Sequence, residues 1–183
     1  MIPSAHDFPN LFAPASWGAV VQQFALCDAP PPMHLISNVD VVPFVGNKCV
    51  IIQLENGDWE MPGGTLEPDE TYLDAASREL LEEAGARLLN FTLIGAWHCH
   101  SSAQEPYRPH LPHPHFYRVA GYGPVELYTL PLNPEGGEKV VAVECVTPEE
   151  AKARYMEVGK LDLAELYMLA AKVRIESEVG ESL

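Results

Sequence analysis

Three glutamates, Glu79, Glu82 and Glu83, fall within five consecutive positions of the stretch GGTLEPDETYLDAASRELLEEAGA, residues 63–86. Unpaired like charges at helical spacing destabilise a helix, by roughly 0.2–0.5 kcal/mol for each facing pair. A chain that holds such charges together therefore needs a compensating partner for them, and this requirement constrains both the local fold and the chemistry of the protein.

The residues around the glutamates predict a helix over residues 71–84. Asp69 or Thr71 can cap its first turn, and Gly85 stands where a left-handed C-cap is favoured. At about 100° per residue, the helix has an apolar stripe that should face the core, made of Leu73, Ala76, Leu80 and Ala84. The three glutamates occupy the neighbouring arc, at i, i+3 and i+4, so we expect their carboxylates to converge.

Converging carboxylates oppose one another's ionisation unless a cation lies among them. Oxygen ligands without a His or Cys partner suit Mg²⁺ or Mn²⁺ better than zinc. Upstream, Gly63 and Gly64 leave the backbone bare, so a carbonyl or a ligand phosphate can approach closely. If the chain loops back at Pro68, Glu70 can reach Arg78. We expect these two residues to form a structural ion pair, which would leave the three helix acids free for metal.

These residues together resemble the Nudix box, G-x5-E-x7-R-E-U-x-E-E-x-G-U, in which U is aliphatic. The matching positions are Gly64, Glu70, Arg78, Glu79, Leu80, Glu82, Glu83 and Gly85, while Ala86 is a small residue for the last aliphatic position. The preceding WEMPGG also resembles the lead-in that is usual in the family. A chance match of eight fixed positions at fixed spacing is improbable, so the chain is identified as similar to Nudix hydrolases.

The resemblance implies an α/β/α sandwich and cleavage of a nucleoside diphosphate linked to another group. It also implies that Glu82 and Glu83 are the principal Mg²⁺ ligands, that Glu79 is a further ligand or a base, and that Gly64 offers its carbonyl. Members differ in the residue that deprotonates water, and a glutamate of a later loop often serves. Glu138 is our first candidate for this base; the further candidates are Glu135 and Glu144.

Composition narrows the class of partner. The chain has 11 basic and 26 acidic residues and a formal charge of −15, which would repel a nucleic acid duplex or an mRNA cap. We therefore expect a small nucleotide derivative as the partner: a nucleotide sugar, ADP-ribose or a nucleoside triphosphate. The sequence has four scattered cysteines, no Lys or Arg before Lys48 and no long apolar run. These features predict a cytoplasmic protein that neither spans nor binds a membrane.

The order of elements predicts one α/β domain, with a mixed sheet and helices on its faces, over residues 36–183. Residues 1–35 are rich in proline and read as an N-terminal arm that packs on the domain or on a second copy, as in a homodimer. Within this arm, Ser16 could cap a short helix, although a strand fits nearly as well. Beyond the box we expect strands near 88–101, 115–123 and 139–146 and helices over 147–156 and 162–179.

The long loop at 102–115 is rich in proline and histidine, and a loop of this length is often functional. Tyr107 could stack on a base and Arg108 could hold a phosphate, although a plain surface excursion is an equal alternative.

The histidines flanking this loop raise the alternative of a second metal. His98-x-His100 and His113-x-His115 would each place two imidazoles on one strand face, but a structural zinc site needs a closed set of four ligands. Cys99 between two histidines keeps open a diphosphate-ester isomerase of the same fold. A catalytically weak nucleotide-binding module is the other alternative, and a lost metal glutamate would favour it; none is lost here.

Overall fold

The computed structural model describes the backbone of residues 5–180 and the side chains of residues 5–177. Its helices are α1 Pro9–Phe12, α2 Tyr72–Ala84, α3 Pro148–Glu157 and α4 Leu161–Gly180, with a 3₁₀ turn at Met33–Leu35. Its strands are β1 Ala15–Trp17, β2 Val20–Leu26, β3 Ile36–Val45, β4 Lys48–Leu54, β5 Trp59–Glu60, β6 Gly63–Thr65, β7 Ala86–Leu88, β8 Thr92–Ser101, β9 His115–Leu127 and β10 Val140–Val146. No helix in the described part combines the length and hydropathy that a membrane span requires.

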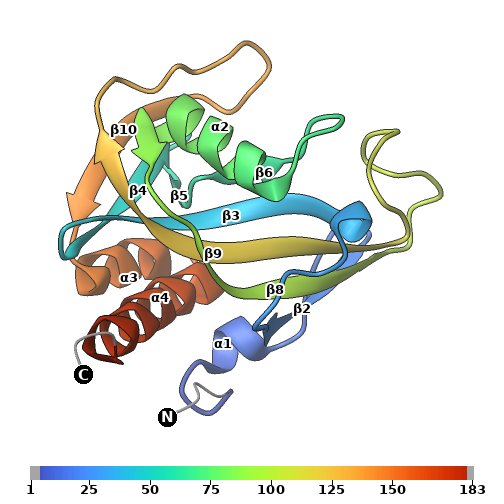
Figure 1. Cartoon of the computed structure of the whole chain (residues 1–183). Helices are drawn as coiled ribbons and strands as arrows, with labels where there is room; N and C mark the ends of the chain where they lie inside the picture. Colours follow the sequence, from blue (N-terminus) through green and yellow to red (C-terminus); the bar gives the residue numbers. More distant parts are fainter. Residues whose placement is uncertain (1–4, 181–183) are drawn as a thin grey trace.

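Within residues 5–180 the strands form one ten-stranded sheet with the order β1-β2-β8-β9-β3-β4-β10, while β5, β6 and β7 attach to β4, β3 and β9. The β3–β9 pair is parallel and the other pairs are antiparallel, so the sheet is mixed. Figure 1 shows α2 on one face of the sheet and α3 and α4 on the other. The predicted α/β/α sandwich is confirmed.

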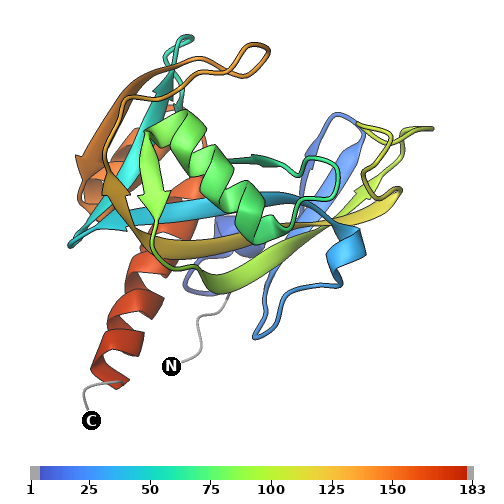
Figure 2. The same ribbon diagram turned by 45° about the horizontal axis from the view of Figure 1, so that its top comes forward.

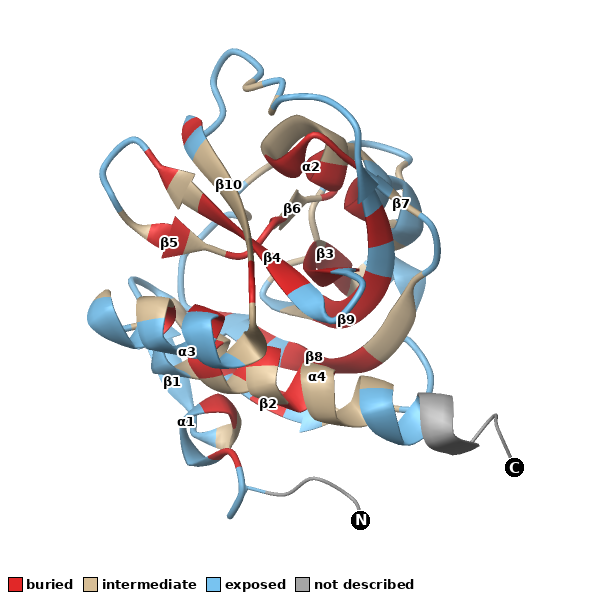
Figure 3. Cartoon of the chain, turned by 90° about the vertical axis from the view of Figure 1, so that its left-hand side faces the viewer, coloured by how far each residue is buried: buried red, intermediate tan, exposed pale blue. Residues whose placement is uncertain are grey.

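Two separate apolar clusters form the core, one on each face of the sheet. The first lies against α1, α3 and α4 and includes Phe24, Phe44, Trp97, Leu166 and Leu169. The second lies under α2 and includes Val39, Val41, Val119, Ala76 and Leu80. Buried positions accordingly gather on β3, β4, β8 and β9 and on the inner side of α2 (Figure 3).

The inner face of α2 differs from the predicted stripe at one position. Leu73 is 45% exposed, and Ala75 is fully buried instead. The buried face is therefore lined mainly by alanines and Leu80, which lets the helix axis approach the sheet closely. The predicted start is confirmed, because Thr71 caps the helix in a reciprocal pair of hydrogen bonds with Asp74.

The N-terminal segment is part of the sheet. The helix considered around Ser16 is wrong, and the strand alternative is confirmed, because β1 and β2 form a hairpin whose second strand pairs with β8 over its whole length. Phe24 from this hairpin is buried against Trp97, with ring centroids 5.0 Å apart. Figure 2 shows the hairpin and the loop between β8 and β9 at the same end of the sheet.

Gly85 ends α2 in the left-handed conformation, with φ +60°. A Cβ at this position would lie 2.1 Å from the Thr129 carbonyl oxygen. Gly46 has nearly the same φ, +57°, but a Cβ there would meet nothing within 4 Å. Substituting each glycine in turn therefore distinguishes the cost of backbone strain from the cost of steric overlap.

We expect Gly46→Ala to lower the free energy of unfolding by about 1–2 kcal/mol, the cost of a left-handed alanine. Gly85→Ala should cost about 1–3 kcal/mol more, because the overlap with a backbone carbonyl adds to the same strain. Urea unfolding of both variants measures the difference. Equal losses would show that the Thr129 segment moves aside without cost.

Candidate active site

Arg78 ties the loop before α2 to the helix. Its Nε and one terminal nitrogen donate to the two Glu70 carboxylate oxygens, at 2.8 and 2.9 Å, and the same terminal nitrogen donates to the Thr65 carbonyl at 3.1 Å. These charged hydrogen bonds hold the pKa of Glu70 below its usual value. The predicted Glu70–Arg78 ion pair is confirmed, and it fixes the position of β6 relative to α2.

Two of the three helix acids that we expected to be free for metal, Glu79 and Glu82, are also paired with Arg78. The remaining terminal nitrogen of Arg78 donates to Glu79 at 2.8 Å and to Glu82 at 3.2 Å. A guanidinium carries five N–H donors in a fixed plane, so one Arg can serve several carboxylates around it. Within residues 5–177, no group of three or more His, Cys, Asp or Glu side chains is placed to hold a metal ion.

Glu79 is folded back against the glycine pair. It is 8% exposed, and a Cβ on Gly64 would lie 2.0 Å from its Oε1 atom. The bare Cα of Gly64 is therefore what makes room for this carboxylate. Burial raises the pKa of Glu79, and Arg78 opposes that shift.

Glu83 lies beside the same glycines, and its Oε2 accepts a hydrogen bond from the Gly63 N–H at 3.0 Å. Burial raises its pKa to about 8; the Gly63 hydrogen bond opposes this rise, and the charges of Glu79, Glu138 and Asp40 add to it. Four carboxyl groups thus contribute negative charge around one short backbone segment. The donors are all hard oxygens with excess negative charge, a set whose chemistry fits Mg²⁺ or Mn²⁺.

The three candidate bases lie in different surroundings. Glu138 is close enough to Glu83 to affect its pKa, and it lines the cavity beside the acids. Glu144 lies on β10 and forms an ion pair with Arg154 at 3.0 Å. Glu135 is exposed in the loop between β9 and β10. Of the three, Glu138 is the one that the structure brings to the acidic cluster.

Asp40 and Arg118 form part of the site that the motif does not contain. Arg118 donates to both Asp40 carboxylate oxygens, at 3.1 and 2.9 Å, and to the Gln22 side chain at 3.3 Å. Asp40 is only 7% exposed. A signal for both was present in the sequence: each is a charged residue inside an apolar strand pattern, VDVVPFV and HFYRVAGYG, and buried charges need partners.

The loop between β8 and β9 rests on the loop that precedes α2. Arg108 pairs with Glu67 at 2.8 Å, and a ring nitrogen of His110 lies 2.8 Å from the Leu66 carbonyl oxygen. Tyr107 is 83% exposed and lines the adjacent cavity. Arg108 therefore holds the loop in place, and Tyr107 is the one of the two that faces the cavity.

The histidines do not gather as a metal site in the described residues. His98, His100 and His115 are exposed; the His98 and His115 rings stack with centroids 5.7 Å apart, and the His100 ring is tilted against His115 with centroids 4.7 Å apart. The expectation that His113 shares a strand face with His115 is wrong, because β9 begins only at His115 and His113 lines the cavity.

The surroundings of Cys99 disfavour a reactive thiolate. It is fully buried on the opposite sheet face from its neighbouring histidines, and burial raises its pKa to about 12. A reactive thiolate requires a lowered pKa. The position of Cys99 between two histidines therefore no longer supports the isomerase alternative.

Comparison with known proteins identifies the class. A sequence model described as NUDIX domain matches residues 34–167. The chain is 30% identical over 141 residues to a MutT-like protein of Streptomyces ambofaciens. The aligned region covers 74% of this chain and 78% of that protein.

Solved structures share the fold at low identity. The Bacillus subtilis pyrophosphohydrolase BsRppH is 20% identical, with a TM-score of 0.57, and the match covers 80% of this chain and 90% of that one. The NUDIX domain of Shewanella oneidensis NrtR, complexed with ADP ribose, is 18% identical, with a TM-score of 0.51 and 76% and 88% coverage. The chain belongs to the NUDIX family and is a Nudix hydrolase.

Proposed function

We propose that this enzyme hydrolyses the pyrophosphate bond of a small nucleoside diphosphate derivative in the presence of Mg²⁺ or Mn²⁺. The candidate substrates are a nucleotide sugar, ADP-ribose and a nucleoside triphosphate. The observation that carries the proposal is the cluster of carboxyl groups around Gly63 and Gly64, in which burial raises the pKa of Glu79 and Glu83. Excess negative charge of this kind is tolerated where a divalent cation neutralises it.

Glu79, Glu82, Glu83 and the Gly64 carbonyl would hold the cation. When bound, it supplies charge neutralisation to the phosphate oxygens and lowers the pKa of water. Glu138, in the loop before β10, would accept the proton of the attacking water. Arg78 is a positioning residue in this proposal: it holds Glu79 and Glu82 on one side of α2 and fixes the loop through Glu70.

The charge of the whole chain supports a small substrate. A net charge of −15 disfavours binding to a nucleic acid backbone, which requires neutralisation of many phosphates. A single pyrophosphate group escorted by a divalent cation avoids that repulsion. The MutT-like relative and the ADP-ribose complex of the NrtR NUDIX domain support nucleotide derivatives as the class to be tested. We further propose that the enzyme acts in the cytoplasm.

The test is a panel of nucleotide diphosphate derivatives assayed with Mg²⁺, with the two phosphate products identified. We expect turnover of at least one compound, loss of that turnover in excess chelator, and recovery on adding Mg²⁺ or Mn²⁺. Full turnover in chelator would contradict a cation-dependent hydrolase. Tight binding of a panel member without any turnover would favour the nucleotide-binding module instead.

A further inference from the structure

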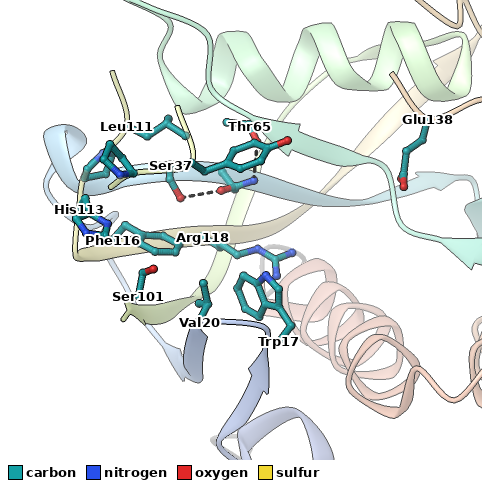
Figure 4. Close-up of a pocket in the computed structure, with 14 residues that line it drawn as sticks. Trp17, Val20, Ser37, Thr65, Ser101, Leu111, His113, Phe116, Arg118 and Glu138 are labelled. Atoms are coloured by element: carbon teal, nitrogen blue, oxygen red, sulfur yellow. Dashed lines mark hydrogen bonds between the residues drawn. The ribbon is translucent and has the colours of Figure 1, made fainter. Parts of the chain in front are cut away.

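A cavity of about 560 Å³ opens on the face of the sheet that also carries α4. Its floor is β9, with Phe116 and Arg118; one wall is the β1–β2 hairpin and the opposite wall is formed by β3 and β6 (Figure 4). The loop between β8 and β9 adds Tyr107 and Leu111. Figure 4 shows Glu138 at the end away from Phe116, so the cavity ends beside the acidic cluster.

Trp17 reaches this cavity from outside the part of the chain that matches the family, which begins at residue 34. Its ring lies 5.5 Å from the guanidinium carbon of Arg118, and the Trp97 ring lies 5.1 Å from the same atom. Trp17 is nevertheless 44% exposed. The hairpin therefore presents a large aromatic surface that is already held in place and still open to a ligand.

The charges of the lining disfavour a phosphate in the body of the cavity. Among the described lining residues, Arg118 is the permanently charged cation, and its charge is balanced by the bidentate contact with Asp40. Glu138 at the far end is an anion. We therefore expect the part of a ligand that fills this cavity to be uncharged and its phosphates to lie at the acidic end, where a cation can accompany them.

The wall opposite Trp17 carries a fixed amide. Asn38 donates to the Thr65 hydroxyl oxygen at 3.1 Å and accepts from the Ser37 hydroxyl at 2.7 Å. A side-chain amide has two N–H donors and an oxygen with two lone pairs, so one donor and one acceptor site of Asn38 remain for a ligand. Planar heterocycles with adjacent donor and acceptor atoms match such an amide, as the bases of nucleic acids do.

We propose that this cavity binds the uncharged heteroaromatic base of the substrate, with Trp17 and Tyr107 as stacking surfaces and Asn38 as the residue that reads the base edge. The N-terminal hairpin is then a specificity element of this chain. This inference rests on the proposed function, because it takes the base to be part of the nucleotide substrate. Base stacking on aromatic side chains is strong and tolerant of the identity of the base, so the selectivity lies in Asn38.

The test uses adenosine, guanosine, cytidine and uridine, which carry no phosphate. We expect at least one to bind the full chain in calorimetry and Trp17→Ala and Tyr107→Ala to weaken that binding about tenfold, whereas Trp17→Phe should restore most of it. Val21→Ala is the matched control, because Val21 is 53% exposed on the same hairpin and lies outside the cavity lining. If Trp17→Ala does not fold, Tyr107→Ala still tests the proposal. Tyr107 is exposed, so its truncation should leave the fold intact.

Hydrolysis of a verified substrate supplies a second readout. Loss of stacking removes binding that is equal in the ground and transition states, so KM should rise about tenfold with kcat unchanged. Unchanged nucleoside affinity in both alanine variants, or no binding of any nucleoside to the parent, would overturn the assignment. Nucleoside binding that depends on Trp17, without hydrolysis of any compound, would overturn the proposed function and leave the base site standing.

Discussion

Glu83→Gln is expected to lower turnover about a hundredfold or more while the melting temperature in chelator stays equal to or above that of the parent. The substitution keeps the side-chain size and the acceptor for the Gly63 N–H, which Glu83 uses at 3.0 Å. It removes a negative charge from the proposed cation site, where that charge supports both water ionisation and phosphate neutralisation. Since burial raises the pKa of Glu83 to about 8, its ionised form is a cost to the folded protein that glutamine does not carry.

Steady-state kinetics at saturating Mg²⁺ and thermal unfolding in chelator measure the two effects. The stabilisation that Mg²⁺ adds to the parent should shrink in the variant, because a weaker site binds less cation at the same concentration. Glu82→Gln should lose turnover to a similar extent. Glu157→Gln, on an exposed position of α3, is the control and should change neither quantity. Near-parental turnover of Glu83→Gln would place the active site elsewhere.

The acidic helix and its loop could be predicted from the sequence because their determinants are local. The Thr71 cap, the Gly85 C-cap and the Glu70–Arg78 pair all lie within 16 positions, and the structure contains each of them. Leu73 was the exception. Periodicity alone could not show that Ala75 packs on the sheet in its place, because that choice depends on how α2 is rotated against β3 and β4.

The N-terminal hairpin was harder to predict because its partner is distant in the sequence. Residues 20–26 pair with residues 95–101, and nothing near Ser16 distinguishes a strand from a short helix. Once β2 pairs with β8, Phe24 packs on Trp97 and Trp17 reaches Arg118. The β1–β2 wall of the cavity therefore depends on a long-range strand pairing. The family motif is local in the sequence and does not include it.

The partners of the charged groups show the same limit. Asp40 and Arg118 are 78 positions apart and meet because β3 and β9 are parallel neighbours. The contact of Arg78 with Glu82 was within reach of the sequence, since i and i+4 positions face each other on a helix, whereas the contact with the adjacent Glu79 was not. Assigning Arg78 to Glu70 alone overlooked how many donors one guanidinium offers.

Arg78→Ala should lower both stability and activity. Its side chain is 27% exposed, and its removal leaves three carboxylates, of Glu70, Glu79 and Glu82, without their shared cation. Breaking a buried ion pair costs about 3–5 kcal/mol, and partial exposure reduces this to about 2–3 kcal/mol. For a domain of this size we expect a melting temperature roughly 5–10 °C lower. Turnover should fall about tenfold or more, because Glu79 and Glu82 lose the contact that positions them.

The pH dependence of the melting temperature tests the cause. The pKa of Glu70 is lowered from 4.5 by its hydrogen bonds with Arg78, so the stabilisation is present above pH 4.5 and is lost as the pH falls through the lowered pKa. The difference between parent and Arg78→Ala should therefore narrow in acid.

Arg87→Ala is the matched control, because Arg87 pairs with Glu126 on an exposed surface, where their side chains are 65% and 52% exposed. An exposed pair contributes about 0–1 kcal/mol, so this variant should keep nearly the parental melting temperature and full turnover. An unchanged melting temperature for Arg78→Ala, with activity abolished, would instead place Arg78 in direct contact with the substrate. In that case a substrate phosphate would compete with the four hydrogen-bonding partners of Arg78. A guanidinium that binds phosphate must release part of its carboxylate contacts.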